Sequence, residues 1–176
     1  MPNTRFSLLL AGCAAASLLA CAVPAAAQKP PTPAAAGSGC GALLTADEVK
    51  AAVGAAMESL GVDKRGEGET ECDWMLRGAP GGLKTVAVSF YDQTAIKASP
   101  TASTGDAFFE MVVKAAEEST SAKREMIPGV GQHAAFVPTA PQTLAVVHRA
   151  DGVARIVANG LSKAQTIAIA KAVATP

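Results

Sequence analysis

The residues TLAVVHRADGVARIVA, numbers 143 to 158, decide the fold class. Apolar residues dominate two segments, 143–149 and 153–158, and the Ala150-Asp151-Gly152 stretch between them carries the Asp-Gly signal of a β-hairpin. Strands joined by so short a turn run antiparallel. A further predicted strand, 133–137, precedes them. The C-terminal half therefore predicts three consecutive strands of an antiparallel sheet.

Two more strands are expected upstream, over 71–76 and 84–91. The segment between them, RGAPGG, contains the Gly and Pro residues of a hairpin connection. In the second strand Val86, Val88 and Phe90 alternate with smaller or more polar residues, which predicts one buried face. The polar, glycine-rich segment 61–70 is predicted to be a loop and 92–105 a connection. The 123–125 triplet is predicted to be a solvated charge cluster.

Three helices are predicted from start signals and apolar spacing. Thr45 and Glu48 fit a capping box that opens a helix running through Val53, with Gly54 or Gly61 as its end and a looser extra turn that would bury Met57 and Leu60. The 106–119 segment is amphipathic. Ser162 and Gln165 fit a second capping box before the C-terminal helix.

The predicted order is α-β-β-α-β-β-β-α. Strands that are adjacent in sequence and joined by short turns favour an antiparallel sheet with helices packed against it. The expected fold is α+β, with about five strands in a single domain over 40–176.

The N-terminal residues have the composition of an export signal. Arg5 precedes an apolar stretch over 6–20, and Ala25-Ala26-Ala27 supplies the small residues that a signal peptidase accepts, so 1–27 is predicted to be a signal peptide. Residues 28–39 are rich in Pro, Ala and Gly and predict an extended linker. The alternative is lipidation at Cys21, which follows a lipobox-like Leu-Leu-Ala. The expected location is periplasmic or secreted, or lipid-anchored to the envelope.

Charge excludes some partners of the exported chain. The sequence has 15 basic and 15 acidic residues, and removal of 1–27 takes away only Arg5, which leaves 14 basic against 15 acidic. A near-neutral chain has no strong electrostatic reason to bind nucleic acid or an anionic membrane, and no membrane span is predicted after cleavage.

The two cysteines of the mature chain, Cys40 and Cys72, are predicted to form a disulfide, because an even pair in an oxidising compartment is most simply a structural bridge. The rival interpretation is a redox or metal pair, but no Cys-x-x-Cys motif is present. We expect the bridge to tie the entry of the first helix to the strand that carries Trp74.

Several short motifs resemble a known group of proteins. Cys40-x-x-Leu-Leu-Thr45, Cys72-x-Trp74 and the Pro-Gly-Val-Gly of 128–131 are similar to small exported bacterial domains of unknown function, often described as lipoproteins, including an actinobacterial group. Relatives often have an acidic pair and an aromatic after that turn, where this chain has Gln132, His133 and Phe136. The resemblance implies an envelope α+β domain with one disulfide and no established chemistry.

Few residues indicate chemistry. His133 and His148 lie on different predicted strands, a placement that allows the two side chains to meet across the sheet. No third ligand is patterned with them, so neither a metal nor another cofactor is predicted. Trp74 and Tyr91 are predicted to pack in a core; the alternative is an aromatic floor of a ligand groove that includes His133. A triad could be drawn from Ser89, either histidine and Asp92, but no nucleophile elbow accompanies it.

The functional prediction is a non-enzymatic exported domain that binds an envelope protein, a peptide or a small molecule. The alternative from another class is a small envelope hydrolase that uses His133 or His148. The third hypothesis is a purely structural interaction module. A concave apolar pocket with convergent polar groups would disfavour this hypothesis.

Overall fold

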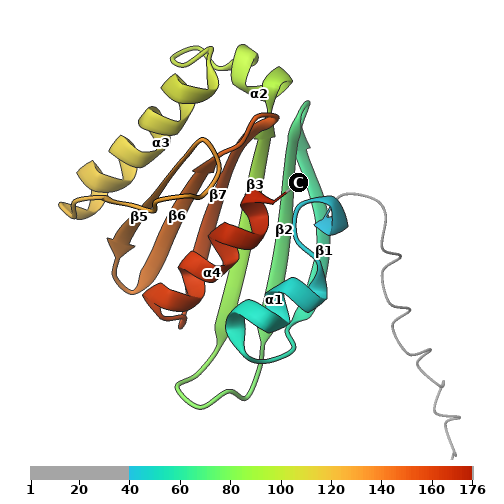
Figure 1. Cartoon of the computed structure of the whole chain (residues 1–176). Coiled ribbons are helices and arrows are strands. Elements are labelled where there is room, and N and C mark those ends of the chain that lie inside the picture. Colours follow the sequence, from blue (N-terminus) through green and yellow to red (C-terminus); the bar gives the residue numbers. More distant parts are fainter. Residues whose placement is uncertain (1–39, 176) are drawn as a thin grey trace, which may run out of the picture. The chain divides into compact units, whose positions relative to one another are not determined.

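A computed structural model describes residues 40–175 (Figure 1). Its seven strands form one antiparallel sheet in the order β1-β2-β3-β7-β6-β5-β4. The strands are β1 (Glu58–Gly66), β2 (Glu69–Leu76), β3 (Lys84–Asp92), β4 (Glu125–Met126), β5 (His133–Thr139), β6 (Gln142–His148) and β7 (Gly152–Asn159). The helices are η1 (Cys40–Ala42), α1 (Ala46–Val53), α2 (Gln93–Ala98), α3 (Gly105–Thr120) and α4 (Lys163–Ala174).

Each face of the sheet carries its own hydrophobic cluster. One cluster packs α1 and α4 against the sheet around Trp74, Phe136 and Ile156. The other packs α2 and α3 against the opposite face around Phe109 and Val146. In Figure 1, α1 and α4 lie together in front of the sheet. The fold is thus a mixed α/β domain with helices on both faces.

The predicted helix starts and hairpins are confirmed. Both capping boxes form, with the Thr45 and Ser162 side chains each accepting a bond from the backbone N–H three residues on. Gly54 ends α1 in the left-handed conformation, with φ of 81°, as expected of a C-terminal glycine. β6 and β7 pair as an antiparallel hairpin across Asp151.

Two strands, β1 and β4, and two short helices, η1 and α2, were not predicted. The two strands bring the sheet to seven rather than about five. β1 occupies residues that were predicted to form an extra helical turn and a loop. Its side chains are almost all exposed and none belongs to either hydrophobic cluster, so Leu60 is 52% exposed rather than buried. α2 lies in the expected connection, where the Asp92 carboxylate caps it. β4 is a two-residue strand on the opposite edge.

Two residues of the charged triplet 123–125, which was predicted to be a solvated cluster, form ion pairs. The Arg124 guanidinium lies 2.7 Å from carboxylate oxygens of both Glu110 and Glu117 on α3. Glu125 pairs with Lys163 at the start of α4. The contacts with Glu117 and Glu110 raise the pKa of Arg124 above its usual range, chiefly through the hydrogen bond to Glu117. Arg124 is therefore held against α3, and Glu125 of β4 is held against the start of α4.

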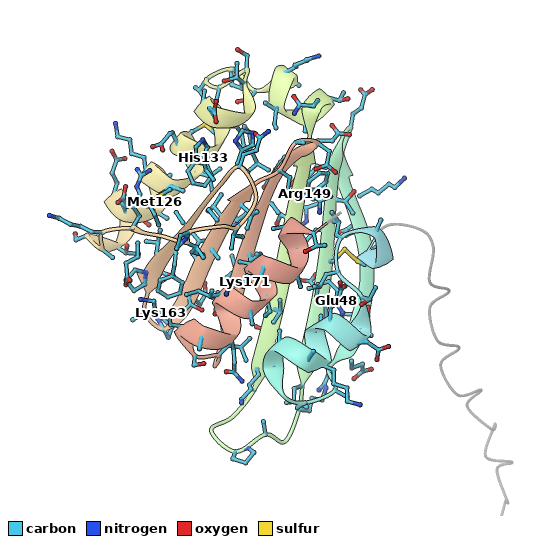
Figure 2. The ribbon with its side chains drawn as sticks, in the orientation of Figure 1. Glu48, Met126, His133, Arg149, Lys163 and Lys171 are labelled. Atoms are coloured by element: carbon cyan, nitrogen blue, oxygen red, sulfur yellow. A yellow bond between two sulfur atoms is a disulfide. The ribbon has the colours of Figure 1, made fainter. Side chains whose placement is uncertain are left out.

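The predicted disulfide is present. Cys40 and Cys72 are bonded, with their Cα atoms 5.6 Å apart, and Figure 2 shows the bridge as a yellow bond. The bridge joins η1 to β2, where Cys72 and the buried Trp74 belong to the same hydrophobic cluster. Among the described helices, none combines the length and apolar character that a membrane crossing needs. The predicted signal peptide, the 28–39 linker and the lipidation alternative at Cys21 lie outside the described residues.

Candidate functional site

A groove of about 660 Å³ runs between α3 and the sheet. The wall on α3 is largely apolar, with Met111, Val112, Ala115 and Ala116, and Leu144 and Val157 of the sheet also line it. The β5–β6 turn, at residues 139–142, closes one end, and Tyr91 of β3 belongs to the lining as well. This volume is in the range of small-molecule sites, roughly 300–1,000 Å³.

Polar side chains also line the groove. They are Ser119 and Thr120 at the end of α3, Thr139 and Gln142 at the β5–β6 turn, and Tyr91 and Arg155 of β3 and β7. Arg155 of β7 is exposed and has no ion-pair partner among residues 40–175. Tyr91 packs its ring against Phe108, with centroids 5.0 Å apart. Burial, followed by the charge of Glu69, raises the pKa of Tyr91 above its usual range, so the phenol keeps its proton at neutral pH. The groove thus offers one guanidinium without an ion-pair partner and, besides the hydroxyls of Ser119, Thr120 and Thr139, one neutral phenol.

The three residues of the predicted aromatic groove are not brought together. Trp74 is 2% exposed and belongs to the cluster under α1 and α4, whereas Tyr91 packs with the cluster under α3. His133 shares the Tyr91 face, because the pairs Tyr91–Val153, Val153–His148 and His148–His133 form one row across the sheet. Three strand spacings, roughly 14 Å, separate its two ends. Of the three, only Tyr91 lines the groove.

The two histidines meet across the β5–β6 pair. His133 and His148 are direct register partners, with ring centroids 6.0 Å apart. Asp106, in the first turn of α3, joins them: its Oδ1 lies 3.0 Å from Nδ1 of His148 and 3.6 Å from Nε2 of His133. Figure 2 labels His133 beside α3. A carboxylate and two imidazoles from three elements therefore form a single cluster.

Gly105 allows α3 to approach this cluster. A Cβ added at Gly105 would lie 2.2 Å from Nε2 of His148 and 3.0 Å from two ring carbons. Real Cβ atoms are never found so close, so the absence of a side chain here lets the start of α3 rest on the imidazole. As a result, the His148 side chain is only 8% exposed.

Two residues of these sites, Arg155 and Asp106, were missed by the sequence analysis. Arg155 lies between the apolar residues Val153 and Val157 on the same face of β7. A charged residue in the middle of an otherwise apolar strand face is a signal that could have been used. Asp106 gives no such signal, because an acidic residue in a first helical turn is common. Its role depends on where α3 packs.

Comparison with known proteins adds no relative: no protein-family model, no curated protein and no solved structure matches the chain.

Proposed function

We propose that the protein is an exported, non-enzymatic binding domain, and that the groove under α3 holds a small, largely apolar ligand with an anionic group. The observation that carries the proposal is Arg155, which has no ion-pair partner among residues 40–175 and is the one charged side chain in the lining of a largely apolar groove. An apolar wall favours the burial of a hydrocarbon or ring, and a guanidinium favours a carboxylate, sulfate or phosphate. Tyr91 supplies a neutral hydroxyl for a further hydrogen bond.

The concave groove also bears on the choice among classes of function. A structural interaction module requires no cavity with polar groups directed into it, whereas a ligand-binding domain does. For the hydrolase alternative, none of the hydrogen bonds among residues 40–175 joins a serine or threonine hydroxyl to His133 or His148. The observed groove therefore favours binding, and the hydrolase stays a prediction without a positioned nucleophile.

Binding of a matched pair of probes tests the ligand class. We expect the protein to bind laurate more tightly than the corresponding uncharged alcohol, dodecanol, in isothermal titration calorimetry. Arg155→Gln is expected to weaken laurate binding about tenfold, equivalent to about 1.4 kcal/mol, and to leave dodecanol binding unchanged. Ala115→Trp, which fills the groove from an exposed position of α3, is expected to weaken the binding of both.

Arg77→Gln is the matched control, because Arg77 is also exposed but lies outside the groove, just after β2. Its affinity for both probes is expected to equal that of the wild type. If Ala115→Trp bound laurate as well as the wild type, the groove would not be the binding site. Equal binding of laurate by wild type and Arg155→Gln would remove the anionic group from the proposal.

Export is the second part of the proposal and has a separate test. The intact mass of the protein recovered from the envelope of a producing bacterium is expected to correspond to a chain that begins at unmodified Gln28. A chain that begins at a lipid-modified Cys21 would instead establish the anchored form. Recovery of the uncut chain from the cytoplasm would contradict export in either form.

A further inference from the structure

We propose that Asp106, His133 and His148 form a binding site for a divalent transition-metal ion of the zinc class. The site is independent of the groove, whose lining includes none of the three residues. The sequence pattern showed two histidines without a third ligand, so this site was not predicted from the sequence. The third ligand comes from the start of α3, which crosses the end of the β5–β6 pair.

The spacing of the three side chains suits a metal ion. Each offers one donor atom, and the three atoms lie within 4.8 Å of one another. Zinc bonds of about 2.0–2.1 Å in tetrahedral geometry place neighbouring donor atoms roughly 3.3 Å apart. The two distances to Asp106 Oδ1, 3.0 Å from His148 and 3.6 Å from His133, lie on either side of that value. The third distance, between the donor nitrogens of the two histidines, is no more than 4.8 Å. Rotation of the exposed His133 and Asp106 side chains can bring the three donor atoms to the spacing that zinc requires.

The buried nitrogen of His148 provides a second, independent observation. Nδ1 is inaccessible and has no hydrogen-bond partner, although Asp106 Oδ1 is 3.0 Å away, because the contact lacks the alignment of a hydrogen bond. A buried polar atom without a partner costs free energy. A metal ion bound between the imidazole and the carboxylate would use the lone pair of this nitrogen.

The fold holds the ligands in place before an ion binds. His133 and His148 are fixed as register partners by the β5–β6 ladder, and Gly105 lets α3 rest on the His148 ring. The outer side of the cluster is open, since His133 is 55% and Asp106 73% exposed. Three protein ligands with an open side leave a coordination position for water or for a donor from another molecule.

The donor set selects the class of ion. Imidazole nitrogen suits zinc, copper and nickel, whereas magnesium and calcium prefer sites made of oxygen atoms. Two nitrogens and one carboxylate should therefore bind Zn²⁺ and fail to bind Mg²⁺ or Ca²⁺. The Cys40 and Cys72 sulfurs are bonded to each other and offer no thiolate.

Zinc titration of the purified, oxidised full chain, produced without a histidine tag, tests the proposal. We expect one Zn²⁺ per chain in isothermal titration calorimetry, together with shifts of the ring-nitrogen NMR signals of both histidines. The midpoint of thermal unfolding should rise by several degrees at saturating zinc, because the ion binds only the folded arrangement. Mg²⁺ should produce neither effect.

Substitution of the exposed ligands assigns the site without disturbing the buried His148. His133→Ala and Asp106→Asn are each expected to weaken zinc binding about tenfold or more. Asp47→Asn is the matched control, because Asp47 is also an exposed acidic residue in the first turn of a helix, α1. Its zinc affinity should equal that of the wild type.

Cobalt serves as a spectroscopic check on the ligands. Co²⁺ bound at the site should give visible absorption bands without a thiolate charge-transfer band in the near ultraviolet. The predicted signal peptide contains two further cysteines, Cys13 and Cys21. A thiolate band that persists in His133→Ala would place the ion on one of them and overturn the assignment. Absence of saturable zinc binding, or equal affinity in the wild type and both ligand variants, would also overturn it.

Discussion

Replacement of both Cys40 and Cys72 by alanine is expected to lower the free energy of unfolding by about 3 to 4 kcal/mol. The bridge spans a sequence separation of 32 residues, and loss of the cross-link returns the entropy of that loop to the unfolded chain. Cys72 is fully buried and Cys40 half-buried, so alanine avoids placing a hydroxyl in the core. Urea unfolding followed by circular dichroism measures the change.

Reduction provides the control for this prediction. A reducing agent should lower the stability of the wild type by about the same amount and leave the double-alanine variant unchanged. Equal stability of the oxidised wild type and the variant would show that the bridge does not stabilise the fold.

Arg149→Met is expected to destabilise the protein by about 2 to 4 kcal/mol. Arg149 is only 6% exposed, and its guanidinium donates two hydrogen bonds to Asp151 and one to the Val173 carbonyl in the last turn of α4 (Figure 2). It also lies over the Phe90 ring, 5.3 Å from the centroid. Methionine fills much of the space but leaves the Val173 carbonyl without this donor. Urea unfolding of the oxidised protein measures the loss.

The matched control is Arg65→Met, which removes an arginine whose side chain is 55% exposed and pairs with Glu71. Exposed ion pairs contribute about 0 to 1 kcal/mol, so this variant should remain close to the wild type. Arg149→Lys should fall between the two, because an ammonium cannot reproduce the forked contact with Asp151. If Arg149→Met and Arg65→Met lost equal stability, the buried guanidinium would have no special role.

The features that the sequence predicted well depend on neighbouring residues. The capping boxes at Thr45 and Ser162 each involve a partner three positions away, so they can be recognised without knowledge of the fold. The same holds for the Asp-Gly turn between β6 and β7. Two adjacent predicted strands allowed His133 and His148 to meet across the sheet, and the structure makes them direct register partners.

The edge strand β1 escaped prediction for a physical reason. A strand that is buried on one face shows alternating apolar residues, but β1 is exposed at all but one position. Its ladder with β2 is also irregular between Ser59 and Gly61 and between Asp63 and Gly66. Because both faces of β1 meet solvent, its sequence is polar and contains glycine. Such a composition is typical of a loop, and this is why a strand was not predicted here.

The candidate sites depended on information that spans the fold. Trp74 lies opposite Val86 in the register, and Val86 and Tyr91 are five residues apart on β3, so Trp74 and Tyr91 point to opposite faces. That conclusion requires the register of β2 with β3. The part played by Asp106 requires the packing of α3 across the sheet, which no local pattern encodes. Local signals therefore predicted most of the elements, and tertiary packing decided which residues meet.

The position of the disulfide also determines how the domain carries mechanical load. Cys40 is the first described residue, and its sulfur is bonded to Cys72 in β2, a strand paired on both sides with β1 and β3. Tension applied to the chain before Cys40 passes through this bond directly into the sheet. The segment 41–71, which contains α1 and β1, is bypassed by the Cys40–Cys72 bond and does not transmit this tension. The bridge thus shields the most exposed edge of the domain from forces transmitted along its N-terminal side.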